Sequence, residues 1–201
     1  MKSAFQSGMT TIPVLIPENL KVTQEQFERL ATANRDVRME RTATGELIIM
    51  PPTGGSTGKR NSEINFQLQA WNRQTGLGVA FNSSTGFKLP NGANRSPDAA
   101  WVRQDRWNTL TQQQQETFPP LCPDFVLELR SKTDNLDPLR QKMQEYLENG
   151  VQLGWLIDAQ NKQVEIYRPE QAVEVVNSPE SLSGEAVLPG FMLDLTVIFA
   201  D

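Results

Sequence analysis

Two acidic residues occupy positions in apolar runs, where a charge is uncommon. Glu128 falls inside FVLELRS, which has the composition of a buried strand, and Asp98 opens a second short run, DAAWV. Burying a carboxylate is costly unless a cation or hydrogen bonds compensate its charge. Two such acids on neighbouring strands could share a divalent ion, because hard oxygen ligands suit Mg²⁺ or Mn²⁺. The pair therefore indicates a candidate metal site.

The strand that carries Glu128 also offers a simpler explanation. Side chains alternate across a strand, so Asp124, Val126, Glu128 and Arg130 share one face. From this strand alone, an ion pair between Glu128 and Arg130 explains the buried acid as well as a metal site does. Asp98, which follows a proline, is by itself typical of a turn that leads into a strand.

A lysine on the helix that follows is the third candidate. The segment LDPLRQKMQEYLENG (136–150) has an apolar stripe and a C-terminal Asn-Gly stop. Lys142 lies three residues after Leu139 and four before Tyr146, so it projects along the flank of that stripe. A lysine in such a place commonly covers the helix edge with its aliphatic stem. The functional alternative is an ammonium directed at the two acids. The stripe comprises Leu136, Leu139, Met143 and Leu147.

The amino-acid composition excludes several classes of active site. The chain has 201 residues, a net charge of -5, one cysteine and no histidine. Without histidine, the Ser-His-Asp and Cys-His systems and the usual zinc-protease sites are excluded. No apolar run approaches the roughly 18 residues of a membrane span, and no secretory signal is evident, so we expect a cytoplasmic protein with no membrane partner.

The remaining pattern predicts strands that alternate with two long helices. Helices are expected at 23–34 and 61–74, the second following a loop at 51–60, and a Gln-rich stretch near 105–117 is expected to be a solvated loop or helix end. The expected hairpins and strands are 37–50, 78–90, 98–102, 123–131, 154–169 and, with one or two closing strands, 185–199. The sequence GGSTGKR fails two of the four fixed positions of a Walker loop, so a polar loop is the better interpretation.

The order of the motifs resembles that of the PD-(D/E)-x-K nuclease superfamily. Asp98 comes first, the triplet ELR at 128–130 second, and a helix with Lys142 and Tyr146 third. More narrowly, SPDAAWV, DFVLELRS, KMQEYLENG, LGWLID and VEIYRP together resemble a restriction-endonuclease family that is greatly expanded in cyanobacteria and consists mainly of proteins of unknown function. The likeness extends from about residue 38 to the C-terminus.

The resemblance implies a fold of the α/β (α+β) class. We expect a restriction-endonuclease-like core, a mixed central β-sheet flanked by helices, with extra β-hairpins. All of it would form a single domain over residues 1–201, with an N-terminal extension over about 1–20 and a core over about 38–201.

The resemblance also implies a site. Asp98 and Glu128 are expected to hold Mg²⁺ or Mn²⁺, and Glu63 is the candidate for the glutamate that the first core helix often adds. The superfamily's usual lysine, two residues after the second acid, is Arg130 here. Arginine stabilises charge but cannot act as a general base. Lys142 could restore the missing function from the helix, as happens elsewhere in the superfamily.

These features predict a metal-dependent nuclease that hydrolyses phosphodiester bonds in DNA, with a twofold homodimer favoured if both strands are cut. The alternative is an inactive nuclease-fold binding or assembly module, which the acidic total and the Arg130 replacement favour. A third possibility, an accessory role in a mobile element or toxin system, has no residue-level support. Four basic residues are expected either to line a nucleic-acid path or to be ordinary surface charges. They are Lys59, Arg60, Lys88 and Arg95.

Overall fold

The centre of the fold is a six-stranded sheet, which we call the main sheet. The computed structural model describes residues 20–200. In the main sheet the strands have the order β10-β9-β8-β7-β6-β3, and β7 and β8 run parallel while the other neighbours are antiparallel. Its strands are β3 (Gly78–Asn82), β6 (Ala99–Arg103), β7 (Phe125–Leu129), β8 (Leu153–Asp158), β9 (Gln163–Tyr167) and β10 (Glu174–Asn177).

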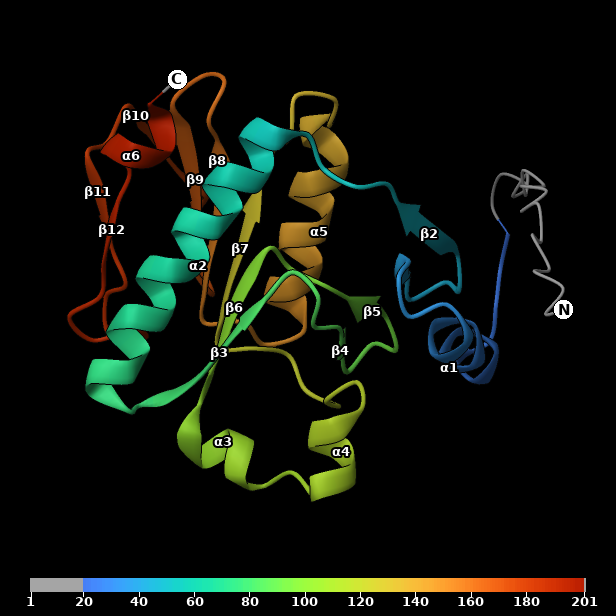
Figure 1. The fold of residues 1–201 in the computed structure, drawn as a ribbon. Coiled ribbons are helices and arrows are strands. Elements are labelled where there is room, and N and C mark those ends of the chain that lie inside the picture. Colours follow the sequence, from blue (N-terminus) through green and yellow to red (C-terminus); the bar gives the residue numbers. More distant parts are fainter. Residues whose placement is uncertain (1–19, 201) are drawn as a thin grey trace, which may run out of the picture.

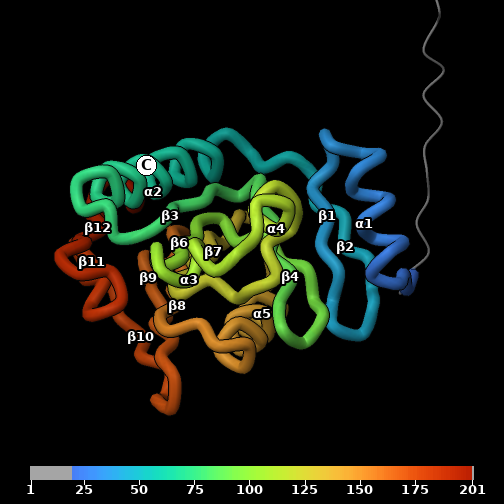
Figure 2. Tube along the Cα trace, turned by 90° about the horizontal axis from the view of Figure 1, so that it is seen from below, coloured from blue at the N-terminus to red at the C-terminus, as the bar shows by residue number. Residues whose placement is uncertain are grey.

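Helices cover both faces of the main sheet. The long helix α2 (Gly55–Thr75) lies on one face and α5 (Leu136–Glu148) on the other, as Figures 1 and 2 show from two directions. A hairpin of β11 (Ser181–Ser183) and β12 (Met192–Asp194) and the short helix α6 (Thr196–Phe199) lie on the side of α2. Two cores result, one on each face, because alternate residues of β6, β7 and β8 point to opposite sides.

A second, small sheet has the strand order β2-β1-β5-β4. Its strands are β1 (Arg38–Arg41), β2 (Leu47–Met50), β4 (Phe87–Lys88) and β5 (Asn94–Arg95). With α1 (Gln24–Ala33), it lies beside α5 at one side of the molecule (Figure 2). The first nineteen residues, which include most of the expected N-terminal extension, lie outside the described part of the chain. Within residues 20–200, no helix has both the length and the apolar character that crossing a membrane requires.

Several local predictions are confirmed. The N-terminal helix has the expected capping box, in which the side chain of Thr23 accepts from the backbone of Gln26 and the side chain of Gln26 accepts from the backbone of Thr23. The hairpins β1–β2 and β8–β9 form as expected. The mixed sheet flanked by helices is also as expected.

The predicted hairpin over 78–90 is wrong, because its two strands belong to different sheets. β3 pairs with β6 of the main sheet, whereas β4 pairs with β5 of the small sheet. Gly78 explains part of this preference: a Cβ there would lie 2.3 Å from the Val102 carbonyl oxygen and 2.5 Å from the Trp101 ring. The missing side chain thus lets β3 approach β6 and its buried tryptophan closely.

The predicted boundaries also shift at two places. The segment expected as a loop at 51–60 turns helical at Gly55, despite the low helix propensity of its glycines. A hydrogen bond from Arg60 to the Ile198 carbonyl ties this part of α2 to α6. The Gln-rich stretch contains two short helices, α3 (Gln104–Asn108) and α4 (Gln112–Glu116). At the C-terminal end, the segment 185–199 supplies one strand, β12, and then α6.

Candidate active site

The two acids predicted from the sequence lie side by side. Ala99 pairs with Leu127 and Ala100 with Val126, so the same register continued by one residue places Asp98 opposite Glu128. Directly opposed residues on antiparallel strands have side chains on the same face. Asp98 is also fixed by the neighbouring strand, because the backbone N–H of Leu129 donates to its Oδ2 atom at 3.0 Å.

Glu128 is held by two residues of α5. The Lys142 Nζ atom lies 2.7 Å from the Glu128 Oε1 atom, and the Tyr146 hydroxyl donates to the same oxygen at 3.1 Å. Lys142 and Tyr146 are four residues apart and therefore share a helix face. That face is turned inward: the Tyr146 side chain is fully buried, and the Lys142 side chain is 11% exposed. Of the two interpretations of Lys142, the contact agrees with the second, an ammonium directed at the acids, but the ion pair is formed with Glu128 and not with Asp98.

A third carboxylate, which we did not predict, joins the site from the small sheet. The Glu40 side chain of β1 is buried, and its Oε1 atom lies 2.8 Å from Lys142 Nζ. The Ser96 backbone N–H donates to the same oxygen at 2.8 Å, and Arg95 Nη1 donates to Oε2 at 3.0 Å. Arg95 Nε donates in turn to Glu145 of α5 at 2.5 Å. Lys142 therefore links the small sheet to the main sheet.

Burial and charge change the pKa values of these groups in different directions. Burial raises the pKa of Glu128 to about 7, although the Lys142 ammonium opposes the change. Burial also raises the pKa of Asp98. Burial would raise the pKa of Glu40 as well, but Lys142 and Arg95 together lower it below its usual value. Burial alone would lower the pKa of Lys142, yet Glu128 and Glu40 raise it, so this lysine stays protonated at neutral pH.

The ion pair between Glu128 and Arg130, one of the two explanations that the sequence left open, is not formed. Arg130 follows the end of β7, and its Nη1 atom lies 2.7 Å from Asp158 Oδ2 at the end of β8. Its Nε atom donates to the backbone carbonyl of Asp134, so the guanidinium is directed along the strand ends. The cation that compensates Glu128 is Lys142, which approaches from α5.

Two residues of α2 reach Asp98, and neither is Glu63. The Asn61 side-chain amide donates to Asp98 Oδ1 at 3.3 Å, and Asn65 donates to the Asp98 backbone carbonyl at 3.0 Å. Glu63 accepts from Gln67, whose side chain also donates to the Asp194 backbone carbonyl. Within residues 20–200, no three His, Cys, Asp or Glu side chains are grouped as a metal site would require. A metal at Asp98 and Glu128 would therefore need other oxygen ligands.

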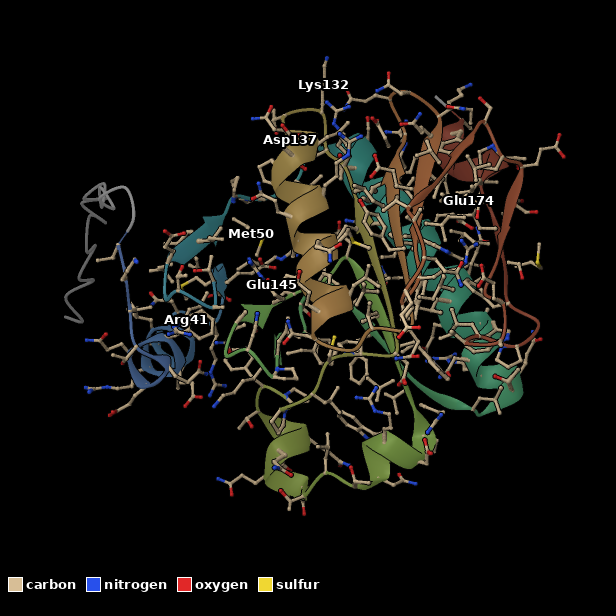
Figure 3. The ribbon with its side chains drawn as sticks, turned by 180° about the vertical axis from the view of Figure 1, so that it is seen from behind. Arg41, Met50, Lys132, Asp137, Glu145 and Glu174 are labelled. Atoms are coloured by element: carbon tan, nitrogen blue, oxygen red, sulfur yellow. The ribbon has the colours of Figure 1, made fainter. Side chains whose placement is uncertain are left out.

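A cavity of about 560 Å³ opens above these acids. It is bounded by the end of β7, the first turn of α2, the loop 130–134 and the end of β2. Figure 3 shows Met50 between β2 and α5, and Lys132 above the start of α5. Cationic side chains outnumber acidic ones in its lining, although the whole chain is acidic. The cationic ones are Arg38, Arg60, Arg130, Lys132 and Lys142, and the acidic ones are Asp98, Glu128 and Asp134.

Of the four basic residues suggested for a nucleic-acid path, one lines the cavity. Arg60 lines the cavity, and its Nε atom donates to the Ile198 backbone carbonyl. Arg95 is buried in its ion pairs with Glu40 and Glu145, so it cannot serve as a surface contact. The lining of this cavity includes neither Lys59 nor Lys88.

The missed residues had only weak signals in the sequence. In RMER, strand alternation places Arg38 and Glu40 on one face, but nothing local shows that this face meets α5. Helix spacing was the available signal for Asn61. It lies three residues before the buried Ile64 and four before Asn65, so these residues share a face, whereas Glu63 points away from Asn61.

Comparisons with known proteins agree with this fold. A solved structure from Anabaena variabilis, described as a "putative nuclease belonging to DUF820", matches with a TM-score of 0.74 and 21% sequence identity. The match covers 89% of this chain and 97% of the other. No curated protein matches the sequence significantly. Residues 24–196 match the Uma2 family, described as "Putative restriction endonuclease". Because this match spans most of the chain, the protein belongs to the Uma2 family.

Proposed function

We propose that this protein is a divalent-metal-dependent nuclease that hydrolyses phosphodiester bonds in DNA. The observation that carries the proposal is the placement of Asp98 and Glu128, opposed on adjacent strands beneath a cavity, with the Lys142 ammonium 2.7 Å from Glu128. The restriction-endonuclease description of the family supports the reaction class. The cationic excess in the cavity lining supports an anionic substrate.

The residues present fit a hard divalent cation. Asp98 and Glu128 supply carboxylate oxygens, and the amide oxygen of Asn61 is buried with no hydrogen-bond partner within the described residues. Because that amide already contacts Asp98, it is well placed to complete an all-oxygen ligand set of the kind that Mg²⁺ and Mn²⁺ prefer. A metal held by these three residues would polarise the scissile phosphate and lower the pKa of an attacking water.

The other residues of the cavity would bind and orient the phosphate. Lys142 is protonated and can offset the negative charge that develops during hydrolysis, but in that state it cannot accept a proton. Arg38 lines the cavity, its Nη2 atom is 3.9 Å from Asp98 Oδ1, and its side chain is 30% exposed, so its guanidinium can bind a phosphate oxygen. The first turn of α2, beginning at Gly55, adds unpaired backbone N–H groups at the cavity wall.

The test is metal-dependent cleavage of supercoiled plasmid, linear duplex, single-stranded DNA and RNA. We expect DNA cleavage in the presence of Mg²⁺ or Mn²⁺, and EDTA should abolish it. Asp98→Asn and Glu128→Gln should each lower the cleavage rate at least a hundredfold, the scale of losing a key catalytic group. Glu165→Gln is the matched control, because Glu165 is equally buried and paired with Arg140 but does not line the cavity. Equal cleavage by wild type and Asp98→Asn would overturn the proposal. Chromatography at several protein concentrations would test the homodimer expected for double-strand cleavage.

One observation favours a second candidate, a nucleic-acid-binding module without catalysis. Glu128 is already compensated by Lys142, and Arg130 is engaged with Asp158, so these charges are balanced by the protein itself. Such a module would bind DNA in a gel-shift assay, without metal-dependent cleavage and with the same affinity in the presence of EDTA.

A further inference from the structure

One ammonium is shared by two carboxylates that come from different sheets. Lys142 Nζ lies 2.7 Å from Glu128 Oε1 and 2.8 Å from Glu40 Oε1. A lysine ammonium has three donors and can satisfy both contacts at once. Both carboxylates are almost completely buried, with residue exposures of 4% and 3%. Both contacts are therefore buried ion pairs, and each of them helps to determine the position of the Lys142 ammonium.

The two carboxylates depend on Lys142 to different degrees. Glu40 has further donors in Arg95 and the Ser96 backbone N–H, each within 3.0 Å. Glu128 has, besides the lysine, only the neutral hydroxyl of Tyr146 among its hydrogen-bond partners in the described residues. Glu40 is thus a fixed anion at the edge of the site. Glu128 is an anion whose main compensating charge comes from a single side chain.

We propose that Glu40 is a positioning residue that retains the Lys142 ammonium when a divalent cation takes Glu128. The inference rests on the proposed function and adds a role for the small sheet. Lys142 and Tyr146 both contact Oε1 of Glu128, so a metal on the other oxygen of this carboxylate would face the ammonium across it, and the two like charges would repel at that distance. Glu40 offers the ammonium a second anion only 2.8 Å away, so the lysine can give up Glu128 without becoming a buried unpaired charge.

Removing the charge of Glu40 should therefore weaken metal binding, but only while Lys142 is present. In Glu40→Gln the lysine has Glu128 as its one carboxylate, so a metal must displace it at greater cost. We expect the Kd for Mn²⁺ to rise about tenfold, equivalent to about 1.4 kcal/mol. In Lys142→Met there is no ammonium to displace, so Mn²⁺ should bind more tightly. Adding Glu40→Gln to that variant should change the Kd by less than about twofold, the usual limit for uncoupled sites.

The experiment measures Mn²⁺ binding directly, by electron paramagnetic resonance of the free ion and by calorimetry. The full-length wild type, the two single variants and the double variant form a complete cycle. Circular dichroism establishes that each variant is folded, and Lys142→Gln, which keeps polar donors, repeats the cycle if the methionine variant unfolds. Glu165→Gln removes an equally buried, paired carboxylate elsewhere and should leave the Mn²⁺ affinity unchanged.

The outcomes separate this inference from the proposed function. If Glu40→Gln weakens Mn²⁺ equally with and without Lys142, Glu40 acts as a general negative charge or a direct ligand, and the inference is overturned. The nuclease proposal survives that result as long as Asp98→Asn abolishes Mn²⁺ binding. If the wild type does not bind Mn²⁺ at all, the proposed function and this inference both fail.

Discussion

Replacing Lys142 with methionine should reveal how much this buried ammonium contributes to stability. The lysine contacts Glu128 at 2.7 Å and Glu40 at 2.8 Å, while Glu40 keeps Arg95 as a second partner. The variant therefore leaves Glu128 as the main uncompensated charge. Breaking a buried pair by removing one partner costs about 3–5 kcal/mol. For a domain of this size, each kcal/mol lowers Tm by about 2–4 °C, so we expect a decrease of about 6–20 °C.

The same reasoning predicts a rescue and a pH dependence. Adding Glu128→Gln to Lys142→Met removes the stranded charge and should recover at least about half of the lost stability. Burial already raises the pKa of Glu128 to about 7, and loss of the ammonium raises this pKa further. The folded variant then binds a proton more readily than the unfolded chain, so its stability increases as pH falls through neutrality. The deficit relative to wild type should be smaller at pH 6 than at pH 8.

Urea unfolding followed by tryptophan fluorescence provides the assay, because Trp101 and Trp155 are buried in the main-sheet core. Measurements at pH 6 and pH 8 on wild type, the single variant and the double variant give the free energies of unfolding. A cost below about 1 kcal/mol, typical of an exposed ion pair, would refute the assignment of Lys142 as a buried counterion. Failure of Glu128→Gln to rescue would show that the lost stability comes from packing alone.

Three further predictions test other parts of the structure. Gly78→Ala should destabilise the protein by about 1–3 kcal/mol, as overpacking does, because the new Cβ meets the Val102 carbonyl and the Trp101 ring. Gly55→Ala, which has open space around it, should not destabilise the protein. Equal urea midpoints for the two variants would contradict this account. Cys122 is buried, and burial raises the pKa of its thiol to about 12, so iodoacetamide should alkylate it far more slowly at pH 8 in the folded protein than in urea; equal rates would contradict this burial. Tyr146→Phe removes a hydrogen bond to the Glu128 carboxylate and should cost about 1.5–3 kcal/mol in urea unfolding; an unchanged midpoint would mean that this contact is not formed.

The sequence predicted the parts of the site that depend on local geometry. Strand alternation places Glu128 on the face that α5 covers, and the spacing of Lys142 and Tyr146 places both on one side of the helix. The sequence also placed Asp98 and Glu128 on neighbouring strands, but the antiparallel register that sets them opposite each other is known only from the structure. Each of the predicted relations involves neighbours within one element or one strand pair, where the backbone repeat determines direction.

Contacts between elements distant in the sequence were not predictable in this way. Glu40 meets Lys142 across 102 positions of sequence, and the pattern of β1 does not reveal which element it packs against. The second hairpin failed for the same reason, because the choice between β4 and β6 as the partner of β3 depends on how closely Trp101 can approach Gly78. Local composition favoured the turn at Ser83 to Gly86, but tertiary packing selected the other partner.

The place where β7 ends explains why Lys142, and not Arg130, compensates the charge of Glu128. Arg130 lies one residue beyond that strand, and Asp158 at the end of the parallel neighbour β8 holds its guanidinium. The guanidinium at position 130 is therefore held sideways against Asp158 of the adjacent strand and not against Glu128. Lys142 approaches Glu128 from α5, above the sheet face that carries this acid, and reaches Glu40 as well. An arginine at position 130 thus does not leave Glu128 without a cation, because the lysine that contacts Glu128 comes from α5.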